Sequence, residues 1–158
     1  AARMNVHARI RRAIPADLDA LLELEEVTFS SDRINRAQWR RHIASDSASV
    51  LVHGEPGAID AAAVVFYRRG SRSARLYSLA VHTHTRGTGL GNALLTAAES
   101  DARARDCTSM RLEVRIDNHA AIALYERHGY ARGIRLPRFY EDGSDAWRYV
   151  KSLTPVTS

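Results

Sequence analysis

The stretch between residues 75 and 117 constrains the fold more than any other part of the chain. An apolar strand pattern over 75–82 leads through a glycine-rich turn to apolar residues at helical spacing over 90–105. A second strand pattern over 110–117 alternates apolar with charged side chains. Two strands joined by a crossover helix run parallel in one sheet. The sequence therefore predicts a strand–helix–strand unit with a parallel pair.

Further elements are predicted on both sides of this unit. Strand patterns over 49–53, 59–67 and 75–82 are separated by tight turns, which predicts an antiparallel meander. The remaining predicted elements are a strand over 6–13, helices over 16–29, 36–44 and from Asn118 to about His128, and strands over 130–138 and 146–153. We expect residues 1–158 to form one α/β (α+β) domain: a mixed, largely antiparallel sheet of six to seven strands around the parallel unit, with about four helices on both faces.

Composition restricts the class of protein and its partners. The chain has 158 residues and a net charge of +5, and Lys151 is its only lysine, so arginine carries almost all the positive charge. Such a surplus favours an anionic partner, which could be nucleic acid, a ribosome surface or a phosphate-bearing cofactor. The longest apolar run, 61–67, is far shorter than a membrane helix, and no basic-then-apolar leader opens the chain. With a single cysteine, Cys107, these features lead us to expect a soluble, cytoplasmic protein with no membrane partner.

The glycine-rich turn is a candidate anion site. It reads Arg86-Gly87-Thr88-Gly89-Leu90-Gly91 and lies between a predicted strand and a predicted helix. Glycine lets the backbone approach a ligand closely, and the first N–H groups of a helix have no partner within it. Together with the helix dipole, they favour binding of a diphosphate. The spacing fits neither a Walker loop nor a dinucleotide-binding fingerprint.

Three segments together closely resemble the GNAT acetyltransferase superfamily. They are Leu79-Ala80-Val81, the Arg-x-x-Gly-x-Gly of the turn, and the stretch from Asn118 to Tyr130, which contains Ala-Leu-Tyr-Glu-Arg-His-Gly-Tyr. Leu112-Glu113-Val114-Arg115 and Arg138-Phe139-Tyr140-Glu141-Asp142 resemble its RimI-type branch, which acetylates protein N-termini. The resemblance is strong from Leu76 to Tyr140, and it implies a GNAT-like fold.

The resemblance implies that acetyl-CoA is the cosubstrate and that no metal is needed. Backbone groups of Leu79, Ala80 and Val81 would hold the pantetheine arm as an added strand does. Asn118 would contact the same arm. The diphosphate would bind the turn that Arg86 begins, at the amides of Gly87, Thr88, Gly89, Leu90, Gly91 and Asn92. His82 and Thr83 depart from the acidic residue and the proline that are more usual in the family, and two histidines, His82 and His84, are too few for a metal site.

The resemblance also assigns the chemistry. Glu113 would be the general base, acting through water, and Tyr125 the general acid for the departing thiolate, besides contacting the cofactor. Arg111 and Arg115 lie on the same strand face as Glu113 and should help to keep it ionised. Asn118 lies two helical turns before Tyr125, so both should share one face.

The sequence favours one class of acceptor and leaves alternatives open. A protein or peptide N-terminal α-amine has a pKa near ~8, against ~10.4 for lysine, and so demands less of a base. The RimI-type resemblance favours that acceptor, with a ribosomal protein as one candidate. Glu25 continues an apolar helix stripe and could hold the acceptor ammonium, or instead extend its tip into water; Tyr140 could cover the peptide. A small-molecule amine or a lysine remains an alternative acceptor, and a non-catalytic acetyl-CoA sensor or RNA-binding module an alternative of another class.

Overall fold

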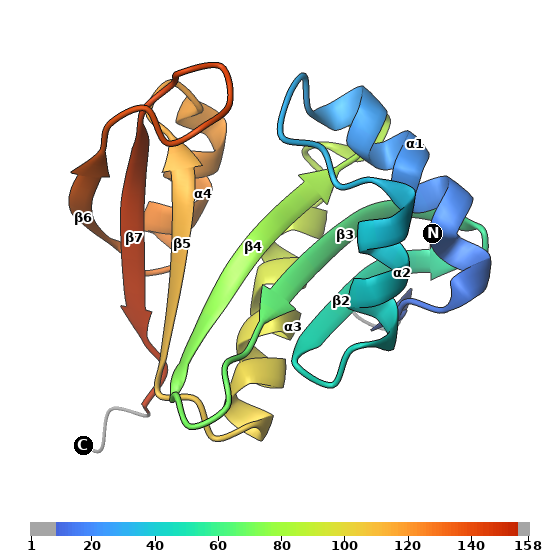
Figure 1. The fold of residues 1–158 in the computed structure, drawn as a ribbon, viewed down its shortest axis with the longest axis horizontal. Coiled ribbons are helices and arrows are strands. Elements are labelled where there is room, and N and C mark those ends of the chain that lie inside the picture. The colour runs from blue at the N-terminus through green and yellow to red at the C-terminus, as the bar shows by residue number, and fades with distance from the viewer. Residues whose placement is uncertain (1–8, 155–158) are drawn as a thin grey trace.

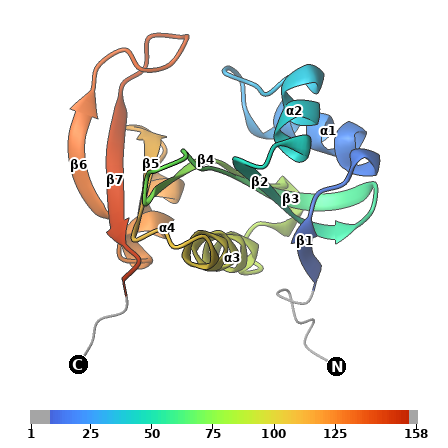
Figure 2. The ribbon, with the colours of Figure 1, turned by 60° about the horizontal axis from the view of Figure 1, so that its bottom comes forward.

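The computed structural model describes residues 9–154, which form one seven-stranded sheet with helices on both faces (Figures 1 and 2). The strands are β1 (Ile10–Arg12), β2 (Ala48–Glu55), β3 (Ala58–Phe66), β4 (Ser73–Val81), β5 (Ser109–Arg115), β6 (Ala131–Leu136) and β7 (Ala146–Ser152). The α-helices are α1 (Leu18–Thr28), α2 (Arg36–Ala44), α3 (Leu90–Ala104) and α4 (His119–Arg127), and short 3-10 turns cover Pro15–Asp17 and Thr83–Thr85.

The sheet has the strand order β1-β2-β3-β4-β5-β7-β6. Only the central pair, β4 and β5, is parallel, and every other neighbouring pair is antiparallel. This topology confirms the predicted meander, the parallel strand–helix–strand unit and the closing pair of strands. It is the mixed, largely antiparallel α/β sheet that the sequence predicted.

The central strands are paired over only part of their length. Residues 73–76 of β4 pair with residues 109–112 of β5, and beyond that point the two strands separate. Figure 1 shows them diverging toward the end of the sheet where α1 lies. A register shift between β3 and β4, which leaves Tyr77 out of the ladder, lies where the separation begins. A bulge bends the strand that carries it, so the second half of β4 turns away from β5. On that edge of β4, within the described residues, the backbone groups have no partner strand.

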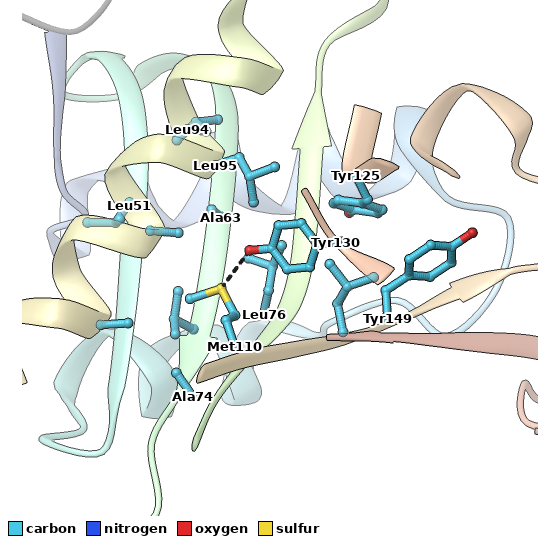
Figure 3. Packing of buried hydrophobic residues seen from close by; sticks show 14 of the residues in the cluster. Leu51, Ala63, Ala74, Leu76, Leu94, Leu95, Met110, Tyr125, Tyr130 and Tyr149 are labelled. Atoms are coloured by element: carbon cyan, nitrogen blue, oxygen red, sulfur yellow. Dashed lines mark hydrogen bonds between the residues drawn. The ribbon is translucent and has the colours of Figure 1, made fainter. Parts of the chain in front are cut away.

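The helices divide the core into two layers. The larger cluster of buried apolar side chains lies under α3 and α4, and the smaller one under α1 and α2. Figure 3 shows the larger cluster, in which the hydroxyl of Tyr130 points to the sulfur of Met110. There the Tyr130 hydroxyl donates to the buried carboxylate of Glu99 at 2.9 Å, so its polar end is satisfied inside the core. Within residues 9–154, no helix is long and apolar enough to cross a membrane.

The helix ends follow from local chemistry. Asn118 caps α4 by accepting a hydrogen bond from the N–H of Ala121 at 3.2 Å, as predicted. Gly129, just past the helix, has a φ of +88°, the left-handed conformation that ends helices. The helix predicted from residue 16 begins instead at Leu18, because a 3-10 turn around Pro15–Asp17 precedes it.

The strand bounds differ from prediction at both ends of the chain. The predicted strand over 6–13 is observed as Ile10–Arg12, and its residues 6–8 lie outside the described residues. The strand predicted over 130–138 ends at Leu136, because the chain turns there and Arg138 has a φ of +50°. Neither difference affects the central parallel pair.

Candidate active site

A cavity of about 300 Å³ opens beside the point where β4 and β5 separate. Its wall comes from the end of α1 and the following loop, from β4, β5 and α4, and from the loop between β6 and β7. The predicted site residues that line it are Glu25, Leu79, Glu113, Asn118, Tyr125 and Tyr140. The structure thus brings together both predicted catalytic residues, both predicted acceptor contacts and part of the predicted cofactor site.

Glu113 lies in this cavity within a cluster of arginines. Its Oε2 accepts from Nε of Arg75 at 3.1 Å, and its Oε1 accepts from Nη2 of Arg148 at 3.2 Å. A third guanidinium, that of Arg111, lies 3.9 Å from Oε1. The Glu113 side chain is only 4% exposed, although it belongs to the polar face of its strand. Both carboxylate oxygens are therefore engaged by guanidinium donors.

Arg115 lies on the same face of β5 as Glu113, as predicted, but within the described residues its ion pairs are with Asp32 and Asp142. Its Nη1 donates to both carboxylate oxygens of Asp142, at 2.9 and 3.0 Å. Its Nη2 donates to Oγ of Ser31 at 2.6 Å, and its guanidinium lies 4.2 Å from the centre of the Tyr140 ring. Arg115 therefore ties the loop after α1 to the β6–β7 loop, and both loops line the cavity.

Glu25 is buried, with 3% of its surface exposed, and its carboxylate lines the cavity rather than reaching into bulk water. Its Oε2 accepts a hydrogen bond from the N–H of Ile34 at 2.8 Å. Burial raises the pKa of Glu25 from 4.5 to about 7, and the Ile34 hydrogen bond and the charge of Arg33 only partly oppose this. A carboxylate with such a pKa exchanges protons readily at neutral pH.

Tyr125 projects from α4 into the same cavity. Among residues 9–154 its hydroxyl has no hydrogen-bond partner, and burial raises its pKa above the usual value for a tyrosine. Its ring packs edge-on against Tyr130, with 5.9 Å between ring centres. The phenol is therefore protonated at neutral pH and free to donate. Tyr140, on the β6–β7 loop, also lines the cavity; it is half-buried, and burial raises its pKa to about 12.

The glycine-rich turn lies outside this cavity and leads into α3. Gly87 and Gly89 have φ values of +83° and +86°. The first hydrogen bond of the helix runs from the N–H of Ala93 to the carbonyl of Gly89, at 3.0 Å. In the described part of the chain, no backbone amide from residue 87 to residue 92 donates a hydrogen bond. Six consecutive unpaired amides at a helix N-terminus fit the diphosphate of acetyl-CoA.

Residues in and beside this turn make contacts that the sequence did not indicate. Asn92 bonds to the ring of His128 at 2.7 Å, so its amide joins α3 to the end of α4. A Cβ on Gly91 would come within 3.3 Å of Cδ2 of Leu124, so glycine allows the two helices to pack closely.

His82 and His84 stack on each other, with 3.6 Å between their ring centres. No group of three or more metal-binding side chains within residues 9–154 could hold a metal ion.

Sequence reasoning missed Arg75, Arg148, Asp32 and Asp142. Arg75 and Arg148 lie 38 and 35 residues from Glu113 in the chain, on the strands that flank it. Only the pairing register could have identified them, because Glu113 and Arg148 are directly opposite each other in β5 and β7. The two aspartates lie in loops, where no periodic pattern marks them.

A model of the Acetyltransferase (GNAT) family matches residues 18–130. The chain belongs to this family. The matched residues span α1 to the end of α4, so the GNAT match includes the glycine-rich turn, the separated strands and most of the cavity wall.

One relative of this GNAT chain is N-alpha-acetyltransferase 30 of Schizosaccharomyces pombe. The two are 39% identical over 72 residues, which cover 46% of this chain and 48% of that protein. The chain thus spans about half the length of this relative.

Solved structures show the same GNAT fold. That of the ribosomal-protein-S18-alanine N-acetyltransferase from Escherichia coli has a TM-score of 0.81 and 24% identity, covering 94% of this chain and 96% of that one. That of yncA from Salmonella typhimurium, with its cofactor acetyl-CoA, has a TM-score of 0.74 and 22% identity, covering 94% and 95% of the two chains. Acetyl-CoA is the cosubstrate of this fold.

Proposed function

We propose that this GNAT chain transfers an acetyl group from acetyl-CoA to a primary amine, and that its acceptor is the N-terminal α-amine of a protein or peptide. The observation that carries the proposal is the meeting of two carboxylates and an unpaired phenol in one cavity where β4 and β5 separate. The name of the S. pombe relative, an N-alpha-acetyltransferase, supports this acceptor class. A ribosomal protein is one candidate acceptor.

The donor would bind on the chain's own backbone groups. The unpaired amides of residues 87–92 would hold the diphosphate, with Arg86 at the start of the turn. Leu79, Ala80 and Val81 lie in the part of β4 that has lost its β5 partner, so their backbone groups would hold the pantetheine arm. Asn118 would contact the same arm. Acetyl-CoA would supply the acetyl group and a thiolate leaving group.

Tyr125 would act as the general acid. Its phenol is protonated at neutral pH, and no hydrogen bond within residues 9–154 holds it away from the cavity. It would donate its O–H proton to the departing sulfur and regain a proton from water. Tyr140, on the β6–β7 loop that lines the cavity, would cover the acceptor.

A carboxylate would accept the proton that the acceptor amine loses, and two of the carboxylates that line the cavity are candidates. Glu113 is the base that the resemblance implies, acting through a water molecule that would share its oxygens with the arginine donors. Glu25 is a second candidate, because its pKa of about 7 lets it hold the ammonium and then take its proton. In the first case Glu25 would bind the ammonium only.

Thiol release from acetyl-CoA tests the proposal, with peptides that have a free α-amine compared with the same peptides blocked at that amine, with lysine blocked at its α-amine and with a polyamine. We expect turnover of the free peptides only. Tyr125→Phe should lower kcat by about 10²- to 10⁴-fold with the fold intact. Turnover of lysine or polyamine alone would refute the acceptor class. Catalysis would be refuted if the protein bound acetyl-CoA but acetylated none of the tested amines. It would also be refuted if single-stranded RNA, and not acetyl-CoA, stabilised the protein against unfolding.

Paired variants separate the two carboxylates. Glu113→Gln and Glu25→Gln should both reduce turnover at pH 7, and loss of the base should cost about 10²-fold or more. At pH 9 most α-amine is already neutral, since its pKa is near ~8. The variant that lacks the base should therefore recover much of its activity at pH 9, whereas a variant that lacks only an ammonium contact should not.

A further inference from the structure

Three arginines gather around Glu113 on one face of the sheet. Arg75 of β4, Arg111 of β5 and Arg148 of β7 lie within 3.1, 3.9 and 3.2 Å of its carboxylate. We refer to these three residues as the arginine cluster. Their side chains are 28%, 39% and 34% exposed, so solvent and ligands can reach each guanidinium. Because one carboxylate faces three guanidinium groups, the cluster keeps an excess of positive charge.

The strand register places the cluster beside the acceptor cavity. Arg75 and Arg111 are directly opposite in the parallel pair, and Arg148 is opposite Glu113. Alternation along the strands then turns all four side chains to one face. Arg75 and Glu113 line the cavity itself. The arginine cluster therefore begins at the cavity and extends from it along the paired half of the strands. Figure 2 shows α1 and α2 over the β2 and β3 part of that face, away from β7.

The side of the cavity formed by α1 and the loop after it is acidic. The buried carboxylate of Glu25 lies there, and so does Asp32, which together with Asp142 faces Arg115. Two carboxylates thus face the one guanidinium of Arg115. The charge of the site is therefore divided: negative where an ammonium would bind beside α1, and positive along β4, β5 and β7.

We infer that the acceptor is a peptide with acidic residues soon after its N-terminal residue. This rests on the proposed function, because it takes the α-amine to bind at the acidic side. The carboxylates that follow would pair with the arginine cluster, since a guanidinium binds a carboxylate through two parallel hydrogen bonds. The cluster adjoins the cavity through Arg75, which lines it, and an extended chain advances about 3.3–3.6 Å per residue. The acidic side chains therefore belong at about the second to fourth positions.

Matched peptides test the inference. Three octapeptides share the same first residue and differ at positions two to four, which carry aspartate and glutamate, asparagine and glutamine, or lysine. We expect kcat/KM to be about fivefold higher for the acidic than for the neutral peptide, and lowest for the basic one. Raising the salt to 0.5 M should reduce the acidic preference to below about twofold, since salt screens exposed charges.

Charge reversal in the cluster provides the second readout. Arg111→Glu should lower the acidic-to-neutral ratio of kcat/KM to below one, and Arg148→Gln should lower it part of the way. Each ratio is measured on a single variant, so any effect on catalysis that both peptides share cancels. Arg69→Glu is the matched control, because Arg69 is exposed in the turn between β3 and β4 and should leave the ratio as in the wild type.

The outcomes are distinct. Equal use of the acidic and neutral peptides, or an acidic preference that survives Arg111→Glu, would overturn this inference and leave the proposed function standing. Acetylation of no peptide would overturn the proposed function itself. Inhibition of neutral-peptide turnover by short single-stranded RNA at a lower concentration than by an N-blocked acidic peptide would assign the cluster to nucleic acid and overturn the peptide proposal.

Discussion

Replacing the buried carboxylate of Glu25 by the neutral amide of glutamine should change the free energy of unfolding in a strongly pH-dependent way. Burial raises the pKa of Glu25 from 4.5 to about 7, which corresponds to about 3 kcal/mol. The folded protein therefore binds more protons than the unfolded chain between these values. The wild type loses this stability as the pH rises through that window, and has lost it in full above pH 7.

The glutamine variant does not titrate and escapes this loss. Its side-chain oxygen can still accept the hydrogen bond from the N–H of Ile34. In urea unfolding, we expect the stability of Glu25→Gln relative to the wild type to rise by about 2 kcal/mol between pH 5 and pH 8. Glu26→Gln is the control, because Glu26 is the exposed neighbour on the same helix and should change stability by less than about 0.5 kcal/mol.

A difference between Glu25→Gln and the wild type that stays constant from pH 5 to pH 8 would refute the reasoning. So would one that moves against the variant as the pH rises. Either result would mean that Glu25 is already ionised in the folded protein near pH 5, and its case as a base near neutral pH would then fail.

Three further predictions concern other parts of the molecule. Asp17 is buried, and burial opposes its ionisation, but hydrogen bonds from Arg11 and from two backbone amides lower its pKa from 3.8 to about 2. Asp17→Asn should therefore lower the free energy of unfolding in urea by about 2 kcal/mol at pH 7, and by progressively less as the pH falls from 4 to 2. Gly89 and Gly70 both have a positive φ and open space where a Cβ would lie, so Gly89→Ala and its control Gly70→Ala should each lower the free energy of unfolding by about 1 kcal/mol. Only Gly89→Ala should weaken acetyl-CoA binding, as measured by calorimetry. Equal affinities of the two variants would argue against the turn as the diphosphate site. Arg115→Gln removes the guanidinium bonds to Ser31 and Asp142 and leaves the N–H of Glu141 on Asp32 to join the two loops. The KM for peptide should rise about fivefold with the KM for acetyl-CoA unchanged within twofold, and an unchanged peptide KM would mean that the Arg115 tie does not shape the cavity.

The local elements could be read from the sequence because short-range chemistry decides them. The helix from Leu90 to Ala104 and the strand that follows it carry clear apolar periods, and Asn118 and Gly129 mark the two ends of α4. The parallel arrangement of β4 and β5 follows from their connection through a helix. The bulge at Tyr77 was not predicted, because a single unpaired residue leaves no periodic signal.

The amino-acid order by itself determined the residue types of the site: a carboxylate on β5, a phenol on α4 and unpaired amides before α3. The tertiary structure alone decided their surroundings. Glu113 and Glu25 are both glutamates near the ends of regular elements, yet guanidinium groups from neighbouring strands surround one, and apolar packing isolates the other. Charge and burial depend on distances in space between residues that are far apart in the chain, and a local pattern carries no information about those distances.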